Sequence, residues 1–255
     1  PDPFNTAKIV TKFGADSVTI HLREDRRHIK DLDAKKICSN KKLLVNLEIS
    51  TNTQMIKNAI KLRPDYICIV PENRKEITTE GGLNLKKNKR KIREILKKFK
   101  EKKIRTSLFI NPTIMDVKIS KEINTDCVEI HTGKLANYVK LRKKFSKELE
   151  KIKRCSILAN QLGIEVHAGH GLDYETTKLL SKIEHIKEFN IGHYIIGESI
   201  FYGLKKVIKN FKNIINNWMK ILGIGVDLVE TKRIARLIND KNFINRIFSK
   251  KEIFN

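Results

Sequence analysis

Residues able to carry out acid–base chemistry recur in this sequence at or near the ends of short apolar runs. The run 17–23 ends with His21 and Arg23 in its last three positions, and the run 43–49 carries Glu48 next to its last residue. The same kind of position is occupied further along the chain by Glu72, Asn111, His131, His170 and His193. Imidazole and carboxylate groups move protons near neutral pH once burial or a neighbouring charge adjusts their pKa. The pattern predicts an acid–base site assembled from several chain segments.

The apolar runs themselves predict the sheet that carries these residues. Seven β-rich runs alternate with helical stretches, and they cover residues 17–23, 43–49, 66–70, 105–111, 127–131, 165–170 and 189–196. In the stretches between them the apolar residues recur at helical spacing, as at Leu85, Ile92, Ile95, Leu96 and Phe99. Strands that alternate with helices in this way form right-handed βαβ units and a parallel sheet.

An open, doubly wound sheet and a closed barrel both fit this alternation. The polar run ends favour a barrel, because (β/α)8 barrels build their active sites at the carboxyl rim and hold phosphate in the loops after the last two strands, where Gly171 and Gly192 occur. No G-x-G-x-x-G or P-loop pattern follows a run. We therefore predict an α/β fold, a TIM (β/α)8 barrel lacking its first strand in this chain, which would lie before Pro1. The runs 17–23 and 189–196 would then present unpaired edges, which favour association unless another segment fills the gap.

Composition bounds the class of protein. The 255 residues are 40% hydrophobic and 32% charged, and no apolar run reaches the roughly 18 residues of a membrane span. The cysteines, at positions 38, 68, 127 and 155, form no C-x-x-C pair, so neither a zinc cluster nor a disulfide framework is expected. The sequence predicts a reduced, cytoplasmic protein.

The net charge of +24 raises the question of a nucleic-acid partner. The lysines are spread along the chain, and aromatic residues make up only 7% of it, so the basic stripe with stacking rings that single-strand binders use is missing. We expect phosphorylated small molecules rather than nucleic acid as partners. A basic nucleic-acid-binding protein remains the alternative from a different class, and steep loss of DNA affinity with salt would reveal it.

Six spaced motifs contain most of the polar residues at the ends of the runs. They are IHLREDRRHI at 20–29, NLE at 46–48, VPE at 70–72 with TTEGG at 78–82, EIHTG at 129–133, AGHG at 168–171 and NIGH at 190–193. Together they resemble the pyridoxine 5'-phosphate synthase family. The resemblance runs in order from residue 1 to about 212. It implies a TIM barrel, typically assembled as an octamer, that condenses 1-deoxy-D-xylulose 5-phosphate with 3-amino-2-oxopropyl phosphate to pyridoxine 5'-phosphate, phosphate and water. Another phosphosugar-handling TIM barrel is the alternative within enzymes, although it would not need the motif at 20–29.

The resemblance also implies roles for single residues, and it implies no cofactor for the barrel. The proton acceptors would be His21 and Glu48, and the proton donor His170. Contacts to the deoxyxylulose phosphate would come from Arg23, His28 and Thr78, and contacts to the aminoketone phosphate from Gly171, Gly192 and His193. Residues 78–82 resemble a loop that closes over the substrates. The family's first strand and the turn after it, which supply an Asn, an Asp-His pair and an Arg, have no counterpart here, so the activity of this fragment is itself in question.

Other polar residues have plainer interpretations. Arg26, Arg27, His167 and His185 are expected to be structural or surface residues. For Glu72 and the pair Glu129 and His131, the sequence does not decide between a role in the site and a structural role inside the barrel. No H-x-x-x-H or facial-triad spacing is present, so a metal site built from the histidines is not expected.

A second resemblance lies at the C-terminal end. Residues 221–234 resemble the start of holo-acyl-carrier-protein synthase, a family that transfers phosphopantetheine from coenzyme A with Mg²⁺. Asp227 would match its first metal-binding carboxylate, and the second would fall beyond Asn255. We accordingly divide the chain into a barrel at 1–212, a helical linker at 213–220 and a partial synthase-like segment at 221–255. The segment is either the start of a fused second enzyme or a nonfunctional strand–helix appendage.

Overall fold

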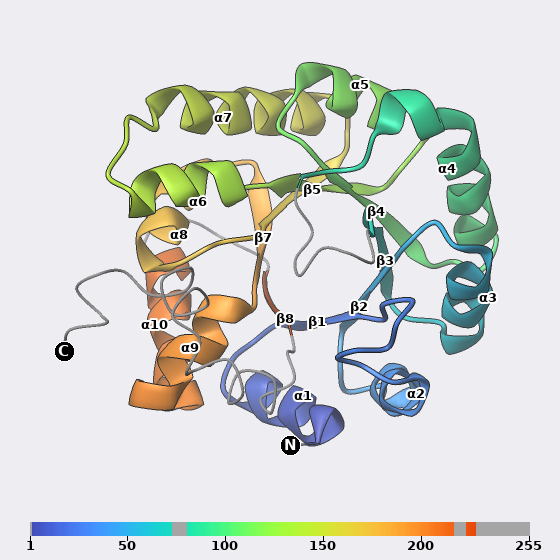
Figure 1. The fold of residues 1–255 in the computed structure, drawn as a ribbon, viewed down its shortest axis with the longest axis horizontal. Helices are drawn as coiled ribbons and strands as arrows, with labels where there is room; N and C mark the ends of the chain where they lie inside the picture. Colours follow the sequence, from blue (N-terminus) through green and yellow to red (C-terminus); the bar gives the residue numbers. More distant parts are fainter. Residues whose placement is uncertain (1, 73–80, 217–222, 228–255) are drawn as a thin grey trace.

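Eight parallel strands close into a barrel in the computed structural model, which describes residues 2–72, 81–216 and 223–227 (Figure 1). The strands are β1 (Ser17–His21), β2 (Val45–Ile49), β3 (Tyr66–Ile69), β4 (Arg105–Ile110), β5 (Cys127–His131), β6 (Glu165–Gly169), β7 (Ile186–Ile191) and β8 (Gly223–Asp227). They are hydrogen-bonded in sequence order, and β8 returns to β1. The predicted TIM barrel is confirmed.

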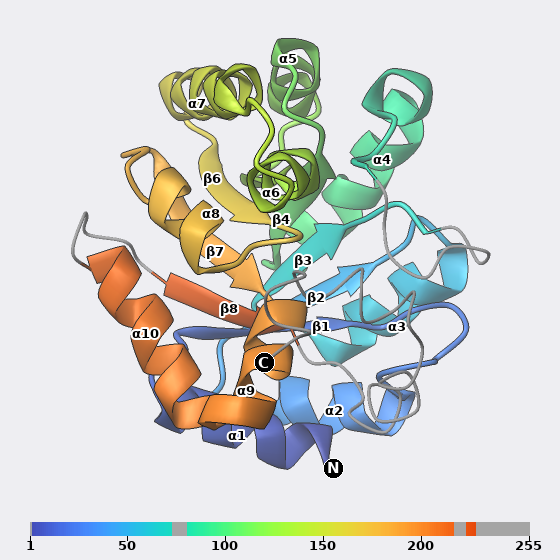
Figure 2. The same cartoon turned by 60° about the vertical axis from the view of Figure 1, so that its left-hand side comes forward.

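Helices surround the barrel on its outer side (Figure 2). They are α1 (Pro3–Lys12), α2 (Asp31–Ser39), α3 (Thr53–Leu62), α4 (Leu85–Lys100), α5 (Ile114–Glu122), α6 (Gly133–Lys140), α7 (Ser146–Gln161), α8 (Tyr174–Leu180), α9 (His193–Tyr202) and α10 (Leu204–Asn216). The five apolar residues predicted to share one face of the helix at 85–100 are all buried. That face packs inward, while the lysines of α4 remain in water.

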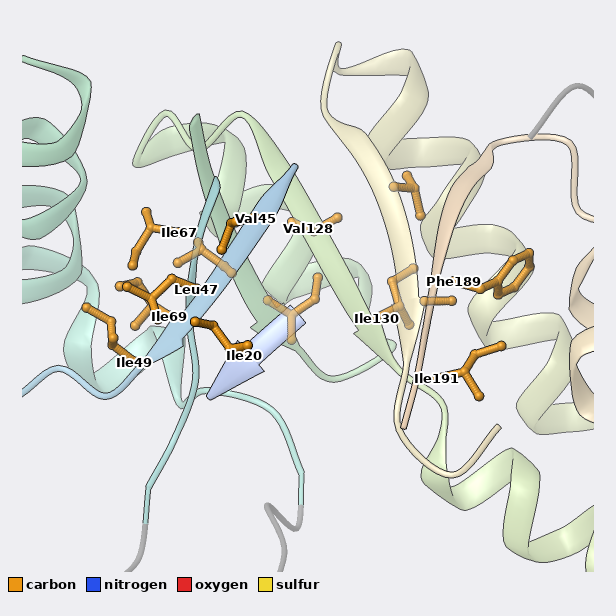
Figure 3. Packing of buried hydrophobic residues seen from close by; sticks show 14 of the residues in the cluster. Ile20, Val45, Leu47, Ile49, Ile67, Ile69, Val128, Ile130, Phe189 and Ile191 are labelled. Carbon is orange, nitrogen blue, oxygen red and sulfur yellow. The ribbon is translucent and has the colours of Figure 1, made fainter. Parts of the chain in front are cut away.

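The hydrophobic core is formed by strand residues and the inner faces of the helices. Ile20, Leu47 and Ile67 come from consecutive strands and are fully buried in one continuous cluster (Figure 3). Strands of a parallel barrel are covered on both sides, which is why the sequence shows them as nearly unbroken apolar runs. The polar residues that interrupt these runs therefore lie in the barrel interior or at its ends.

Strand β8 takes the place between β7 and β1 where the sequence predicts a missing strand. Gly225 pairs in register with Ser17 of β1 and with Asn190 of β7. The expectation of unpaired edges at 17–23 and 189–196 was wrong, because residues 223–227, which we had assigned to a separate segment, pair with both. A glycine is required at position 225, since a Cβ there would lie 2.1 Å from Asn190 Oδ1.

Two predictions from composition concern the described residues directly. No helix within 2–72, 81–216 and 223–227 is long and apolar enough to cross a bilayer. All four cysteines are buried and form no disulfide, as predicted.

Candidate active site

His21 and Glu48, the two predicted proton acceptors, lie side by side at the carboxyl rim of the barrel. They end neighbouring strands and are partners in the register of β1 and β2. His21 Nδ1 is 3.7 Å from Glu48 Oε2, and the two side chains are 14% and 15% exposed. The parallel sheet thus brings two motifs that are separated in sequence into contact, and it leaves both side chains partly exposed.

Glu72 approaches the same imidazole from the other side. Its Oε2 lies 3.6 Å from His21 Nε2, and its Oε1 accepts a hydrogen bond of 2.9 Å from the backbone N–H of Glu24. Arg23 Nη2 is 3.8 Å from Glu72 Oε1. Burial alone would raise the pKa of the Glu72 carboxyl, but His21, the Glu24 N–H and Arg23 hold that pKa below its usual value. Glu72, which the sequence left open, is therefore an ionised carboxylate in contact with the site.

His170, the predicted proton donor, follows β6 and stacks on His131 of β5. The ring centroids are 4.8 Å apart and the planes are inclined by 26°. Phe109 meets His131 edge-on with centroids 5.4 Å apart. His170 has a backbone φ of +78°, an uncommon conformation for a residue with a side chain. Burial lowers the pKa of His131, which favours its neutral form. The predicted donor His170 therefore stacks on an uncharged ring.

A layer of buried polar residues lies inside the barrel beneath this rim. Asn190 Nδ2 donates to Glu129 Oε2 over 2.8 Å, and Thr19 Oγ1 donates to Asn190 Oδ1 over 2.9 Å. Asn46 Nδ2 reaches Thr19 Oγ1 at 3.4 Å. The sequence left the role of Glu129 open and did not predict a role for Thr19 or Asn46. Each of these two residues precedes a predicted site residue by two positions, so strand periodicity places both members of the pair on the same face of the strand.

The predicted phosphate-binding residues fall into two loop regions. His28 is half-buried between β1 and α2, and Arg23 is buried there with 4% exposure. Gly171 has φ +75° after β6, and Gly192 is the N-cap of α9, whose first residue is His193. Backbone N–H groups at a helix start suit an anion. Because β6 and β7 are neighbours, these last three residues share one side of the rim, whereas Thr78 lies outside the described residues.

A separate titratable cluster closes the amino end of the barrel, away from this site. Cys127, Glu165 and His167 are the one group of three in the described chain whose possible metal-ligand atoms all lie within 4.8 Å of one another. His167 Nε2 donates to Glu165 Oε1 over 2.9 Å, and Arg105 Nη2 lies 3.3 Å from Glu165 Oε2 and 3.4 Å from Cys127 Sγ. The positive guanidinium of Arg105 already occupies the position beside Glu165 and Cys127 and would repel a metal cation. We therefore interpret the cluster as an ion-pair network.

Asp227, the predicted Mg²⁺ ligand, is the last residue of β8 and is in register with Thr19. Its backbone therefore lies in the barrel sheet instead of a separate synthase-like unit. Residues 228–255, where the rest of that segment was predicted, are outside the described residues.

Comparison with known proteins identifies the family of this chain. The family model described as "Pyridoxal phosphate biosynthesis protein PdxJ" matches residues 1–217. Pyridoxine 5'-phosphate synthase of Pelagibacter ubique (strain HTCC1062) is 63% identical over 216 residues, which are 85% of this chain and 90% of that relative. The synthase of Nautilia profundicola is 42% identical over 237 residues, covering 85% of this chain and 92% of the relative.

A solved structure extends the comparison to the fold alone. The BexX/CysO complex of Amycolatopsis orientalis contains a chain that superposes with a TM-score of 0.58 at 10% identity, covering 85% of this chain and 86% of that one. Likeness at that identity concerns the barrel and not the chemistry. The family match covers most of the chain and the nearby relatives align along the same stretch, so this chain belongs to the PdxJ family of pyridoxal phosphate biosynthesis proteins.

Proposed function

We propose that this protein is a pyridoxine 5'-phosphate synthase, which condenses 1-deoxy-D-xylulose 5-phosphate with 3-amino-2-oxopropyl phosphate in vitamin B6 biosynthesis. The observation that carries the proposal is the set of acid–base groups at one rim: His21 between Glu48 and Glu72, with the His131–His170 pair on β5 and the turn after β6. The names and identities of the relatives support the same reaction.

The reaction requires proton transfers that these groups can perform. The amine of the aminoketone condenses with the carbonyl of the sugar phosphate and loses water, and enolisation and further eliminations then lead to the aromatic ring. Each step removes a proton from one atom and delivers one to another. We assign His21 and Glu48 as acceptors and His170 as donor, and we propose no cofactor, since neither electron transfer nor a carrier group is involved.

Two groups of residues would hold the two phosphate esters. Arg23, His28 and Thr78 are proposed for the deoxyxylulose phosphate, where a buried guanidinium offers charge-assisted hydrogen bonds. Gly171, Gly192 and His193 are proposed for the aminoketone phosphate, where the start of α9 points N–H groups at an anion. Both substrates would then present their carbonyl carbons to the acid–base groups between these two regions.

The test is formation of pyridoxine 5'-phosphate from the two substrates, with phosphate release measured in parallel. Glu48→Gln keeps the shape of the side chain but removes the base, and turnover should fall by about 10²–10⁴-fold. Glu148→Gln is a matched control, because Glu148 is also poorly exposed, at 9%, and lies on α7 in ion pairs with Lys134 and Lys151. Near-normal turnover in Glu48→Gln would refute its role, and no product from the wild-type protein would refute the function.

We further propose that the protein forms a homo-oligomer, as the octamer of the family resemblance implies. Support comes from Ile200, Phe201 and Tyr202 at the end of α9, which are 53%, 65% and 57% exposed. Consecutive exposed apolar residues of this size often mark an interface. Sedimentation velocity on the wild-type protein and on Phe201→Ser should show a larger species that the substitution weakens. A monomer at micromolar concentration would contradict the proposal.

Location and partners follow from the same features. The four unbridged cysteines support the predicted cytoplasmic location. Phosphorylated small molecules are the proposed partners, and the dispersed lysines do not favour nucleic acid.

The phosphopantetheinyl transferase resemblance of residues 221–255 stays a prediction, as does Mg²⁺ binding by Asp227. The family match ends at residue 217, before this segment. Incubation of the chain with Mg²⁺, coenzyme A and an apo carrier protein tests it by mass spectrometry. We expect no mass gain, because Mg²⁺ is usually held by more than one carboxylate or by substrate phosphates as well; a gain would place the second ligand within residues 221–255.

A further inference from the structure

We propose that Glu72 is a positioning residue for this reaction: its buried carboxylate holds a ring proton of His21 on Nε2, so that Nδ1, on the side facing Glu48, is the nitrogen that exchanges a proton with substrate. This inference rests on the proposed role of His21 as a proton acceptor. It adds a residue whose place in the chemistry the sequence left open.

The contacts of His21 show why the choice of nitrogen matters. The ring lies between two carboxylates, with Nδ1 3.7 Å from Glu48 Oε2 and Nε2 3.6 Å from Glu72 Oε2. A neutral imidazole carries one proton, and the nitrogen that holds it is the one facing the stronger acceptor. Only the other nitrogen can then accept a proton from substrate.

Glu72 is the stronger of the two acceptors. Its side chain is 0% exposed, compared with 15% for Glu48, and a charge pair attracts more strongly where water is excluded. Arg23 and the Glu24 N–H stabilise the Glu72 carboxylate, so it can remain ionised throughout a catalytic cycle. Glu48, which is proposed to take a proton itself, cannot provide a constant charge.

The hydrogen bond from Glu24 also fixes the direction of the Glu72 side chain. Because Oε1 is held by that N–H at 2.9 Å, Oε2 is the atom directed at the imidazole. Three buried atoms of this cluster, His21 Nε2, Arg23 Nη2 and Glu72 Oε2, lie just beyond hydrogen-bond range of any partner atom in the described protein. Catalytic contacts are often long before substrate binds and tighten in the complex.

Arg23 connects this cluster with substrate binding. Its guanidinium lies near Glu72 and is also a proposed contact of the deoxyxylulose phosphate. A substrate phosphate that binds Arg23 would change the interaction between Arg23 and Glu72, the carboxylate that orients His21. The rim therefore places phosphate recognition and orientation of the acceptor within one set of contacts.

The substitution Glu72→Gln tests the proposal. The Gln carbonyl can still accept from the Glu24 N–H, which turns the amide NH₂ toward His21 Nε2 and forces the ring proton onto Nδ1. We expect kcat to fall by about 10–100-fold, the size of the loss when the hydrogen-bonded partner of a metal-bound His is removed, while KM for both substrates changes little. Loss of the negative charge beside the imidazole should also move the acid limb of the pH–rate profile to lower pH.

The controls separate this inference from the proposed function. Wild-type protein and Glu148→Gln must both form pyridoxine 5'-phosphate, and failure of both refutes the function itself. If they are active, an unchanged kcat in Glu72→Gln, or a loss of kcat with an unshifted acid limb, overturns the positioning role. Should Glu72→Gln not fold, Glu72→Asp keeps the charge but withdraws it from the ring, and a wild-type kcat in that variant overturns the role as well.

Discussion

The imidazole of His170 lies stacked on that of His131, with ring centroids 4.8 Å apart and planes inclined by 26°. The main chain permits this because Gly133 stands directly beside the two rings. A Cβ at position 133 would lie 2.7 Å from His170 Cδ2 and 2.9 Å from His131 Cε1. The proposed proton donor is thus held in place by a neighbouring histidine and by the absence of a side chain.

Gly133→Ala should therefore lower turnover with little change in stability. The added methyl must displace one of the rings, and a misplacement of about 1 Å can cost up to about 100-fold in rate. Steady-state kinetics and thermal unfolding together measure the two effects. Gly197→Ala on α9 is the control, because a Cβ at that position would have no atom of the described residues within 4 Å apart from those of its own helix turn and chain neighbours. Equal kcat in the two variants would show that the stacked geometry is not needed.

The ion pairs at the amino end of the barrel predict a pH-dependent stability. The hydrogen bond from His167 helps to hold the pKa of Glu165 at about 2, below its ordinary value of 4.5, so this contribution is present above pH 4.5 and is lost as the pH falls toward 2. Despite burial, Glu188 and Glu165 raise the pKa of His167 above its ordinary 6.5, so that contribution is complete below pH 6.5 and is lost at higher pH.

Wild type should accordingly exceed Glu165→Gln in unfolding free energy most clearly between about pH 4.5 and 6.5. Urea unfolding across a pH series measures the difference. The control is Glu175→Gln, a substitution of the same type at an exposed residue. A constant difference at every pH would mean that Glu165 stabilises the barrel by packing and not by charge.

Asn190 should stabilise the buried polar layer inside the barrel through its hydrogen bond to the Glu129 carboxylate. In Asn190→Ala the amide that donates to Glu129 Oε2 over 2.8 Å is lost, and a hydrogen bond to a charged group contributes about 1.5–3 kcal/mol. Chemical unfolding should register that loss of stability. Asn210→Ala, which removes only a 3.4 Å hydrogen bond to the Tyr174 hydroxyl, should cost less. Equal losses would contradict the prediction.

Strand β8 should contribute to the barrel's stability through its backbone pairing with β1 and β7. Gly225→Val would place a Cβ 2.1 Å from Asn190 Oδ1 and 2.9 Å from Thr19 Oγ1, and overpacking of this kind typically costs about 1–3 kcal/mol. Ending the chain after Asn216 should expose two strand edges and promote association. Light scattering and thermal unfolding report both effects. A truncated protein as stable and monodisperse as the full chain would show that β8 is dispensable.

Much of this protein follows from the sequence by itself. The alternation of apolar runs with helical stretches predicts a parallel barrel, because a fully covered strand must be apolar on both faces. The carboxyl ends of parallel strands share one rim, so His21, Glu48 and His170 were predictable as members of a common site from their positions in the runs alone. These features depend on local patterns, which a linear sequence displays directly.

Other features were decided by the tertiary structure, because they depend on which distant segments meet. The sequence could not show whether Glu72 braces the barrel or serves the site; its 3.6 Å approach to His21 from the loop after β3 decides that it contacts the site. It also could not show that residues 223–227, which the sequence assigns to a separate segment, pair with β1 and β7. Strand pairing is formed by backbone hydrogen bonds, so the sequence of a strand does not identify its neighbour. The closed geometry of the barrel decides the neighbour, together with the fit of single residues such as Gly225.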